Sequence, residues 1–454
     1  MTETTAAPGS PHALKRVIGR WTLLLFVVGD ILGAGIYALV GKVAGEVGGA
    51  LWLPFLVAFT LAALTATAYA ELVGKYPRAA GAALYANKAF GLPFVTFIVA
   101  FAVLMSGITS ASAAALAFGG AYLGEFVTVP VVVGALVFLA LVTLVNFAGI
   151  SESIKVNVVL TVIEAFGLLV IVAIGVYALL RGDGEPARAL EFHPETGALL
   201  GVLGGTALAF YALLGFEDSV NLAEEAKNPP RDFPRALFGG LAVATVIYMA
   251  VAFTATTLVE TETLVNSTGP LLEVVRVAGL AFPPKLFALI ALLAVGNTAL
   301  INMLMASRLV YGMAREGIVP RVFAAVHPRR STPWAAILFT VAVAVVLVAT
   351  GDVGGLADTT VLLLLCVFAM VNAAVLVLRR DRVEHGHFRA PSWMPALGAA
   401  VCLLLALPVT GRGAEVYLRA GLLLGIGAVL WFVNRLFLSG RDGDRSGSER
   451  QQSP

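Results

Sequence analysis

The sequence predicts an all-α membrane protein with about twelve transmembrane helices, and its composition, its apolar runs and its charge pattern predict this class. Hydrophobic residues make up 59% of the 454 residues and charged residues only 13%, a balance that excludes an ordinary soluble domain. The net charge of +2 is too small to indicate a nucleic-acid-binding surface. The chain is therefore expected to be a polytopic protein embedded in a lipid bilayer.

Twelve apolar runs are each expected to cross the membrane as a helix, because the hydrocarbon layer is about 30 Å thick. They cover about residues 22–44, 50–72, 94–123, 129–149, 156–180, 199–222, 236–259, 283–307, 334–350, 357–378, 394–410 and 418–438. A polar tail at 1–20 precedes them and lacks the apolar core of a signal peptide. A second polar tail at 439–454 is rich in Gly, Ser, Arg and Asp, and we expect it to be disordered.

The basic residues indicate which way the helices run. They cluster in the N-terminal tail and in the loops after the second, sixth, eighth and tenth apolar runs, whereas the alternate loops hold far fewer. By the positive-inside rule, both termini are expected to face the cytoplasm. We expect an integral protein of the cytoplasmic or plasma membrane.

The first apolar run is interrupted at residues 29–37, which read GDILGAGIY. Glycine lets the backbone leave a helix without steric cost, so Gly33-Ala34-Gly35 is the expected site of a break. The N-terminus of the half-helix that follows such a break carries partial positive charge, which suits a carboxylate. Gly29 and Gly33 also form a small-xxx-small pair, and close packing of two helices explains that pair equally well.

A second interrupted run occurs five spans later, at 204–218, and again combines glycines with acidic residues. Because five is an odd number, the second set of five spans must run inverted relative to the first. Interrupted helices at matching positions of two inverted halves indicate the binding site of a secondary transporter. We therefore expect a five-plus-five inverted repeat at 21–181 and 182–380, with spans one and six broken, and two further C-terminal helices at 381–438.

Four groups of residues carry a family resemblance and follow one another between residues 20 and 380. They are Gly33 to Tyr37; Glu71-Leu72, Pro77, Gly81 and Tyr85; Phe210 to Glu217, Asn221, Ala223 to Glu225, Lys227 to Pro229, Arg231 and Pro234 to Ala236; and Ser307-Arg308, Met313 to Gly317, Pro320 and Thr332-Pro333. Together they resemble the amino acid permeases of the amino acid/polyamine/organocation (APC) superfamily. The resemblance implies the five-plus-five fold, alternating access, and a substrate held at the breaks of spans one and six.

The resemblance also implies individual site residues at the two breaks. The substrate carboxylate would contact the backbone of Gly33, Ala34, Gly35 and Ile36. The ammonium group would contact the backbone carbonyls of Phe210, Tyr211, Ala212 and Leu213. Tyr211 falls where relatives have an aromatic gate over the substrate, although an aromatic residue in a span also simply packs. Glu217 matches an acidic residue on the inner side of the second break, which makes it a candidate for the cytoplasmic gate.

Asp30 and Glu164 are two more acidic residues within predicted spans. A charge in the middle of a bilayer is costly, so such residues face a cavity, pair with another group or bind protons. Several members of the resembling family have a lysine at the fifth-span position of Glu164, and we hypothesise that Glu164 couples transport to protons or coordinates a cation. The negative charge of Asp30 would favour a cationic group on the substrate. Alternatively, Asp30 and span five would together form a site for a proton or sodium ion. A hydrogen bond to an adjacent helix would explain either residue without a functional role.

The eighth span carries the polar residues Asn297, Thr298 and Asn302. Thr298 and Asn302 are four residues apart and therefore share a helix face. That face would line a cavity or supply ligands to a cation, and hydrogen bonds between helices explain the same pattern.

These observations predict a secondary active transporter that moves amino acids by alternating access, coupled to protons. The alternatives are an amino acid/polyamine exchanger, a sodium-coupled symporter and, from another class, a non-transporting receptor or a channel, although the scattered acids form no continuous channel lining. No histidine lies in a span, and Cys366 and Cys402 stand alone in apolar runs. We therefore expect no enzyme activity, no metal site and no cofactor other than a coupling H⁺ or Na⁺. The expected partners are a small amino acid or polyamine and the bilayer, without nucleic acid.

Overall fold

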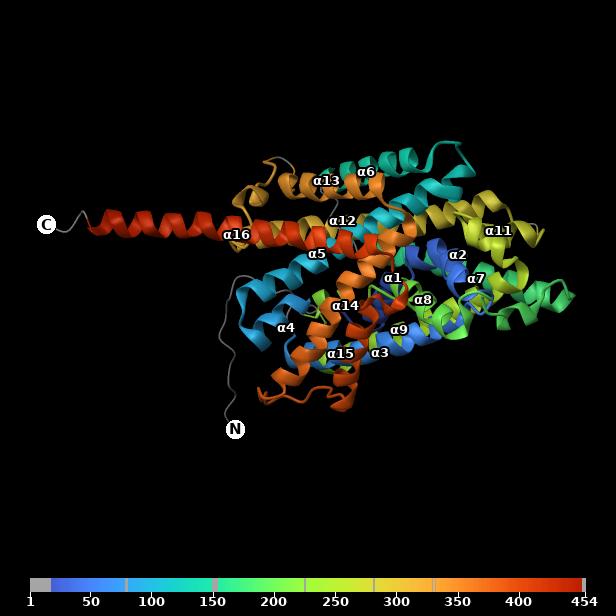
Figure 1. Ribbon diagram of the computed structural model, residues 1–454, viewed down its shortest axis with the longest axis horizontal. Helices are drawn as coiled ribbons and strands as arrows, with labels where there is room; N and C mark the ends of the chain where they lie inside the picture. The colour runs from blue at the N-terminus through green and yellow to red at the C-terminus, as the bar shows by residue number, and fades with distance from the viewer. Residues whose placement is uncertain are drawn as a thin grey trace.

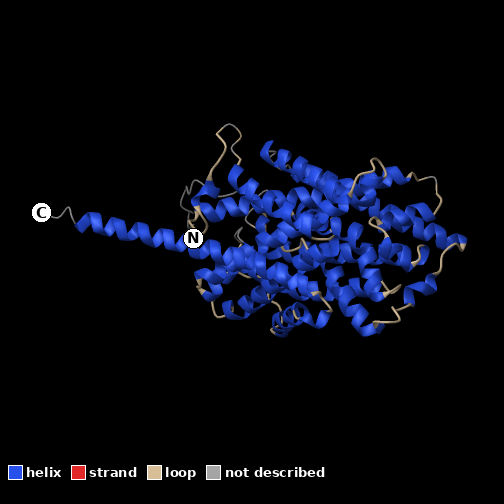
Figure 2. Ribbon diagram, turned by 45° about the horizontal axis from the view of Figure 1, so that its top comes forward, coloured by secondary structure: helices blue, strands red, loops and turns tan. Residues whose placement is uncertain are grey.

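The computed structural model describes residues 18–77, 81–148, 154–223, 226–280, 282–328, 330 and 332–450. Within these residues the protein is helical, with two isolated bridges and no strand (Figure 2). The tail predicted at 1–20 lies outside the described residues except for its last three, and so do Glu224 and Glu225 of the family motif.

The helices follow one another along the chain with short connections. They are α1 (Arg20–Ile31), α2 (Ala34–Val47), α3 (Trp52–Lys75), α4 (Gly81–Phe90), α5 (Pro93–Ala117), the π-helical turn η1 (Phe118–Tyr122), α6 (Val131–Ala148), α7 (Ile154–Arg181), η2 (Pro186–Leu190), α8 (Gly197–Ala212), η3 (Asp218–Leu222), α9 (Pro229–Leu258), α10 (Thr261–Asn266), α11 (Pro270–Val277), α12 (Pro284–Arg315), η4 (Arg321–Ala324), α13 (Trp334–Thr350), α14 (Val353–Leu378), α15 (Trp393–Ala406), η5 (Pro408–Thr410) and α16 (Ala414–Arg450).

The lengths of these helices match a membrane protein. Among the described residues, eight helices are long and apolar enough to cross a bilayer, and α1 and α2 together make a ninth segment that is bent by 41°. Three shorter apolar helices, α8, α13 and α15, lie where the other three spans are predicted. The all-α polytopic fold is confirmed, while the count of twelve spans and the inverted repeat stay predictions.

The first break lies at Leu32 and Gly33, between α1 and α2, so the helix resumes at the second residue of the predicted Gly33-Ala34-Gly35 element. Such a break exposes carbonyl groups that would be costly to leave unpaired in a membrane. The hydroxyl of Tyr248, on α9, donates a hydrogen bond of 2.5 Å to the carbonyl oxygen of Ile31. The broken end of α1 is thus stabilised by a neighbouring helix.

The second break follows Ala212, where α8 gives way to a five-residue turn at 213–217 and then to η3. Gly215 lies in this turn with φ = +113°, a backbone conformation that side chains disfavour. Its N–H donates a hydrogen bond of 2.9 Å to the Glu217 carboxylate. The turn is therefore stabilised by its own acidic residue.

The helices pack so that the two breaks come together. Helix α2 contacts α8, α3 contacts α9, and α5 contacts α12, so each pair joins helices five predicted spans apart. Helix α14 crosses the middle of the molecule and contacts α3, α5, α8 and α15 (Figure 1). The core of the protein thus surrounds the interrupted helices.

Figure 1 shows the two ends of the molecule, which we call the α4 end and the α11 end. Different contacts join the helices at each end. At the α11 end, the N–H of Ala50 donates to the Glu191 carbonyl and the Trp52 indole donates to the Ala189 carbonyl, each at 3.0 Å. At the α4 end, the buried Glu71 carboxylate accepts hydrogen bonds of 2.8 and 2.7 Å from Arg379 at the end of α14. Glu71 of the family motif thus joins α3 to α14.

Helix α16 leaves the body of the molecule at the α4 end (Figure 1, red). It runs to Arg450 and so includes most of the 439–454 stretch for which we expected disorder. Residues 451–454 lie outside the described residues.

Candidate functional site

A cavity of about 1250 Å³ lies between α1, α2, α5, α8 and α12 and extends toward the α4 end. Both helix breaks contribute to its wall: Gly33 and Gly35 from the first, and Leu214 and Gly215 from the second. A cavity that combines apolar walls with a few converging polar groups is the usual form of a small-molecule site. The breaks therefore lie beside a space large enough for a small solute.

The N-terminus of α2 is held in place by a side chain from α12. The backbone N–H of Ala34, the first residue of α2, donates a hydrogen bond of 3.0 Å to Thr298 Oγ1. A Cβ atom added at Gly33 would lie 2.5 Å from the same Oγ1, and one added at Gly35 would lie 2.4 Å from Ala212 Cα. Gly33 and Gly35 thus allow close helix packing as well as the break, while the carboxylate site stays a prediction.

A chain of polar side chains connects the second break to α12. The hydroxyl groups of Tyr211 and Ser110, on α8 and α5, are 3.0 Å apart. Asn302 donates to Ser110 Oγ at 3.5 Å and to the Thr298 carbonyl at 3.0 Å. The Tyr211 side chain is only 6% exposed, and its ring lines the cavity. The bond to Ser110 holds the Tyr211 side chain at the cavity wall.

Carboxylates mark the cavity wall where α1 meets the second break. Asp30 and Glu217 both line the cavity, and both lie against Gly215. A Cβ atom at Gly215 would lie 2.5 Å from the Asp30 carbonyl oxygen and 3.3 Å from its carboxyl carbon. Asp218, the first residue of η3, is a third acid on the wall. This part of the cavity favours positively charged groups.

Glu164 lies one residue behind the cavity wall. Its side chain is 1% exposed, and its Oε1 accepts a hydrogen bond of 3.2 Å from Asn297, which lines the cavity. Its Oε2 has no hydrogen-bond partner among the residues that the structure describes. Its backbone carbonyl accepts a bond of 2.8 Å from Tyr37 on α2. Glu164 is therefore connected both to the cavity and to the first broken helix.

The residues predicted from the sequence divide into two groups in the structure. Those that line the cavity are Asp30, Gly33, Ala34, Gly35, Tyr211, Ala212, Glu217, Asn297, Thr298 and Asn302. Glu164, as described above, lies behind the wall. Ile36, Phe210 and Leu213 are fully buried at 0% exposure and are also not part of the wall. Their side chains pack behind the breaks, as expected if only the backbone of these segments were to meet a solute.

Ser110 is one of several polar residues of the wall that were not predicted from the sequence. It lies in the third predicted span, in a stretch that also carries Ser106, Thr109 and Ser112. Such a concentration of hydroxyl groups in an apolar helix was the available signal, because polar side chains within a span usually bond to another helix. Thr109 does so as well, with Thr360 of α14 at 2.7 Å.

Comparison with known proteins identifies the family. The family model described as "Amino acid permease" matches residues 18–420. An uncharacterized transporter of Mycobacterium tuberculosis (strain ATCC 25618 / H37Rv) is 30% identical over 450 residues, 98% of this chain and 97% of that protein. The branched-chain amino acid permease of Bacillus subtilis (strain 168) is 26% identical over 452 residues, 94% of this chain and 95% of the permease.

A plant relative is similar over a shorter range. Cationic amino acid transporter 9 (chloroplastic) of Arabidopsis thaliana is 30% identical over 348 residues, 72% of this chain and 60% of the relative. The chain therefore belongs to the amino acid permease family of the APC superfamily, and it is an integral membrane transporter rather than an enzyme.

Proposed function

We propose that this transporter moves amino acids across the membrane by alternating access, driven by a proton gradient. The observation that carries the proposal is the meeting of both helix breaks on one cavity. Broken helices facing each other near the middle of the membrane offer opposite partial charges to a solute that bears both a carboxylate and an ammonium group.

The substrate carboxylate would bind at the N-terminus of α2. The first N–H groups of a helix have no partner within the helix, and they attract anions. Because the Ala34 N–H already donates to Thr298, the carboxylate would use the N–H groups that follow, at Gly35 and Ile36, or displace the Thr298 hydroxyl. The ammonium group would meet the carbonyls at the end of α8, with Tyr211 closing over it as a gate.

Glu164 is the proposed site of proton coupling. It is buried beside the first broken helix and bonds to Asn297 on the cavity wall, so protonation there would change the hydrogen bonding of a wall residue. Asp30 lines the cavity itself, and its carboxylate would attract a positive charge on the substrate or on the coupling ion. Glu217 bonds within the turn of the second break, where a change in its charge would alter that turn and act as a gate.

The cavity extends to the α4 end, which we propose to be the cytoplasmic side. Its wall there includes Asn87 of α4 and Arg308, Glu316 and Gly317 at the end of α12. The basic loops next to these residues are expected inside the cell by the positive-inside rule, which would put both termini in the cytoplasm and the protein in the cytoplasmic membrane. The conformation would then be one that is open to the inside.

The substrate class is drawn from the charge of the wall. Asp30, Glu217 and Asp218 lie at the breaks, whereas the basic residues of the wall, Arg308 and Arg435, lie toward the mouth. This distribution favours a cationic amino acid, with a polyamine as the second candidate. Of the relatives described above, the Bacillus subtilis permease is named for branched-chain amino acids and the Arabidopsis thaliana transporter for cationic amino acids, so both side-chain classes belong in the test.

The test is uptake of labelled amino acids and polyamines into proteoliposomes, with proton and sodium gradients imposed separately. Saturable accumulation of one substrate class with an inward proton gradient is the expected result. Accumulation driven by a sodium gradient alone would indicate sodium symport instead of proton symport. Uptake only into preloaded vesicles would indicate an exchanger. Absence of flux under every gradient would favour a receptor, and conductance without saturation would favour a channel.

A further inference from the structure

Helix α16 lies outside the predicted repeat, yet three of its residues line the cavity. Trp431, Asn434 and Arg435 belong to the wall, near the mouth at the α4 end. The guanidinium of Arg435 sits over the Trp431 ring at 5.0 Å from its centroid. A solute that passes through the mouth therefore passes this helix.

At the mouth, α16 touches both sides of the opening. On one side, the Trp431 ring meets Phe94, at the start of α5, with the ring centroids 5.0 Å apart in an edge-on arrangement. On the other side, the Asn434 side-chain amide donates a hydrogen bond to the carbonyl oxygen of Gly317. Gly317 follows the end of α12 and has φ = +72°, so the backbone at this contact adopts a turn suited to glycine. Helix α16 thus bridges α5 and the end of α12.

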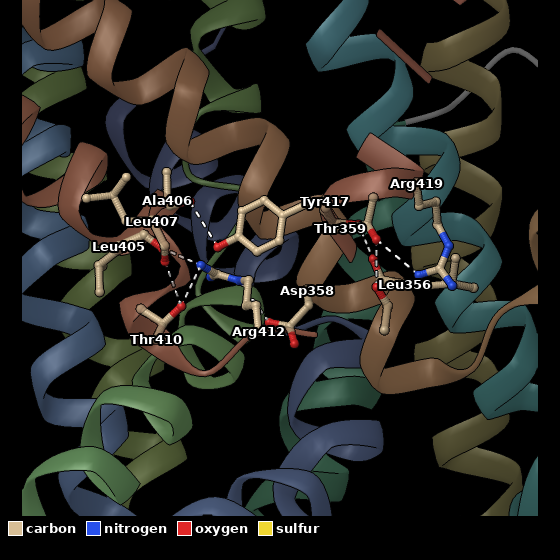
Figure 3. A network of polar contacts seen from close by, with 12 residues as sticks. Leu356, Asp358, Thr359, Leu405, Ala406, Leu407, Thr410, Arg412, Tyr417 and Arg419 are labelled. Carbon is tan, nitrogen blue, oxygen red and sulfur yellow. Dashed lines mark hydrogen bonds and ion pairs between the residues drawn. The ribbon is translucent and has the colours of Figure 1, made fainter. Parts of the chain in front are cut away.

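The start of α16 is fixed much more firmly (Figure 3). The side chain of Arg412, in the turn before α16, is 1% exposed and pairs with Asp358 of α14 at 3.4 Å. The same guanidinium donates to the Leu405 carbonyl and to Thr410 Oγ1. Tyr417 adds a bond of 3.1 Å to the carbonyl of Ala406. Breaking a buried, hydrogen-bonded charge pair is costly, so this network anchors the start of α16 to α14 and α15.

We propose that α16 is a movable wall of the cavity mouth and that Asn434 is the positioning residue that holds it in the open arrangement. The helix is anchored at its start by several buried bonds, whereas at the mouth ring contacts join it to Phe94 and a hydrogen bond joins it to Gly317. A neutral hydrogen bond shifts an equilibrium by only about two- to tenfold. The contact at the mouth can therefore form and break during a transport cycle while the anchor stays intact.

This inference rests on the alternating-access cycle proposed above, and its test measures the mouth directly. A cysteine replaces Gly312, which lines the cavity and has open space where a Cβ atom would lie, in a background that carries Cys366→Ala and Cys402→Ala. The rate of modification by a membrane-impermeant methanethiosulfonate is measured from the α4 side in reconstituted vesicles. Because modification requires no substrate, a failure to transport amino acids would leave this measurement intact.

Asn434→Ala is expected to slow the modification by about two- to tenfold, because the arrangement open to the α4 side loses a stabilising bond. Asn434→Asp keeps the size of the side chain but removes the amide donor, and it should slow the modification to the same degree. This second variant serves as the test if the alanine variant folds poorly. Val433→Ala is the matched control, since Val433 is the preceding residue of α16, is 37% exposed and lies outside the cavity wall. Rates for both Asn434 variants equal to or above that of the control would overturn the proposal.

Discussion

A single added carbon atom at Gly35 should disrupt the contact between the two broken helices. A Cβ atom there would lie 2.4 Å from the Cα of Ala212, whereas carbon atoms in good contact are about 3.5 Å apart. In Gly35→Ala, α2 and α8 must therefore separate by about 1 Å, because the obstructing atom belongs to the backbone and cannot rotate away. Overpacking of this kind costs about 1–3 kcal/mol.

The matched control for this prediction is Gly45→Ala in the same helix. A Cβ atom at Gly45 would meet only Val265, at an ordinary distance of 3.7 Å, and replacing a helical glycine by alanine gains about 0.5–1 kcal/mol. Thermal unfolding in detergent should therefore place Gly35→Ala below the wild type and Gly45→Ala at or above it. Uptake by Gly35→Ala should fall about tenfold or more, since its displaced atoms form the proposed carboxylate site. If the two variants proved equally stable and equally active, the close approach of α2 and α8 would be refuted.

Three further variants test the coupling site, the gate and the contact at the α4 end. Glu164→Gln should still exchange external substrate for substrate preloaded inside the vesicles, but it should lose accumulation driven by a proton gradient. Accumulation at the wild-type level would show that Glu164 is not the coupling residue. Tyr211→Phe removes the hydroxyl bonded to Ser110 and should raise the KM for uptake about two- to tenfold; an unchanged KM would show that the ring alone forms the gate. Glu71→Ala leaves the charge of Arg379 without its partner and should lower stability by about 3–5 kcal/mol. Adding Arg379→Met should recover part of that loss, and no recovery in thermal unfolding would contradict the pairing.

The positions of the breaks could be predicted because glycine and acidic residues are rare signals in an apolar chain. Gly33 predicts the first break to within a residue, and the polar residues of the eighth span, such as Thr298, face the cavity as their spacing indicates. These residues stand out because polar and helix-breaking residues are costly in a membrane and occur there mainly where they bond to or line something.

Other features could not be predicted, because an apolar helix gives little sign of which face meets its neighbours. Ser110 is one of several hydroxyl residues on α5, and only the folded structure brings it to Tyr211. The approach of Asn434 to Gly317 joins segments that are 117 residues apart, and no local pattern records such a contact.

Hydrogen bonds within the protein stabilise both helix breaks in the absence of a solute. This has a consequence for the step of the proposed transport cycle in which the empty carrier returns. Thr298 accepts from the Ala34 N–H, Tyr248 donates to the Ile31 carbonyl, and Glu217 accepts from the Gly215 N–H. An unsatisfied polar group costs several kcal/mol in hydrocarbon, so a carrier whose breaks depended on substrate would be trapped once it had released its load. Here the protein's own side chains occupy these positions, so in the proposed alternating-access cycle the unloaded carrier would be able to reorient. Net accumulation requires that return, whereas obligatory exchange requires that it be blocked.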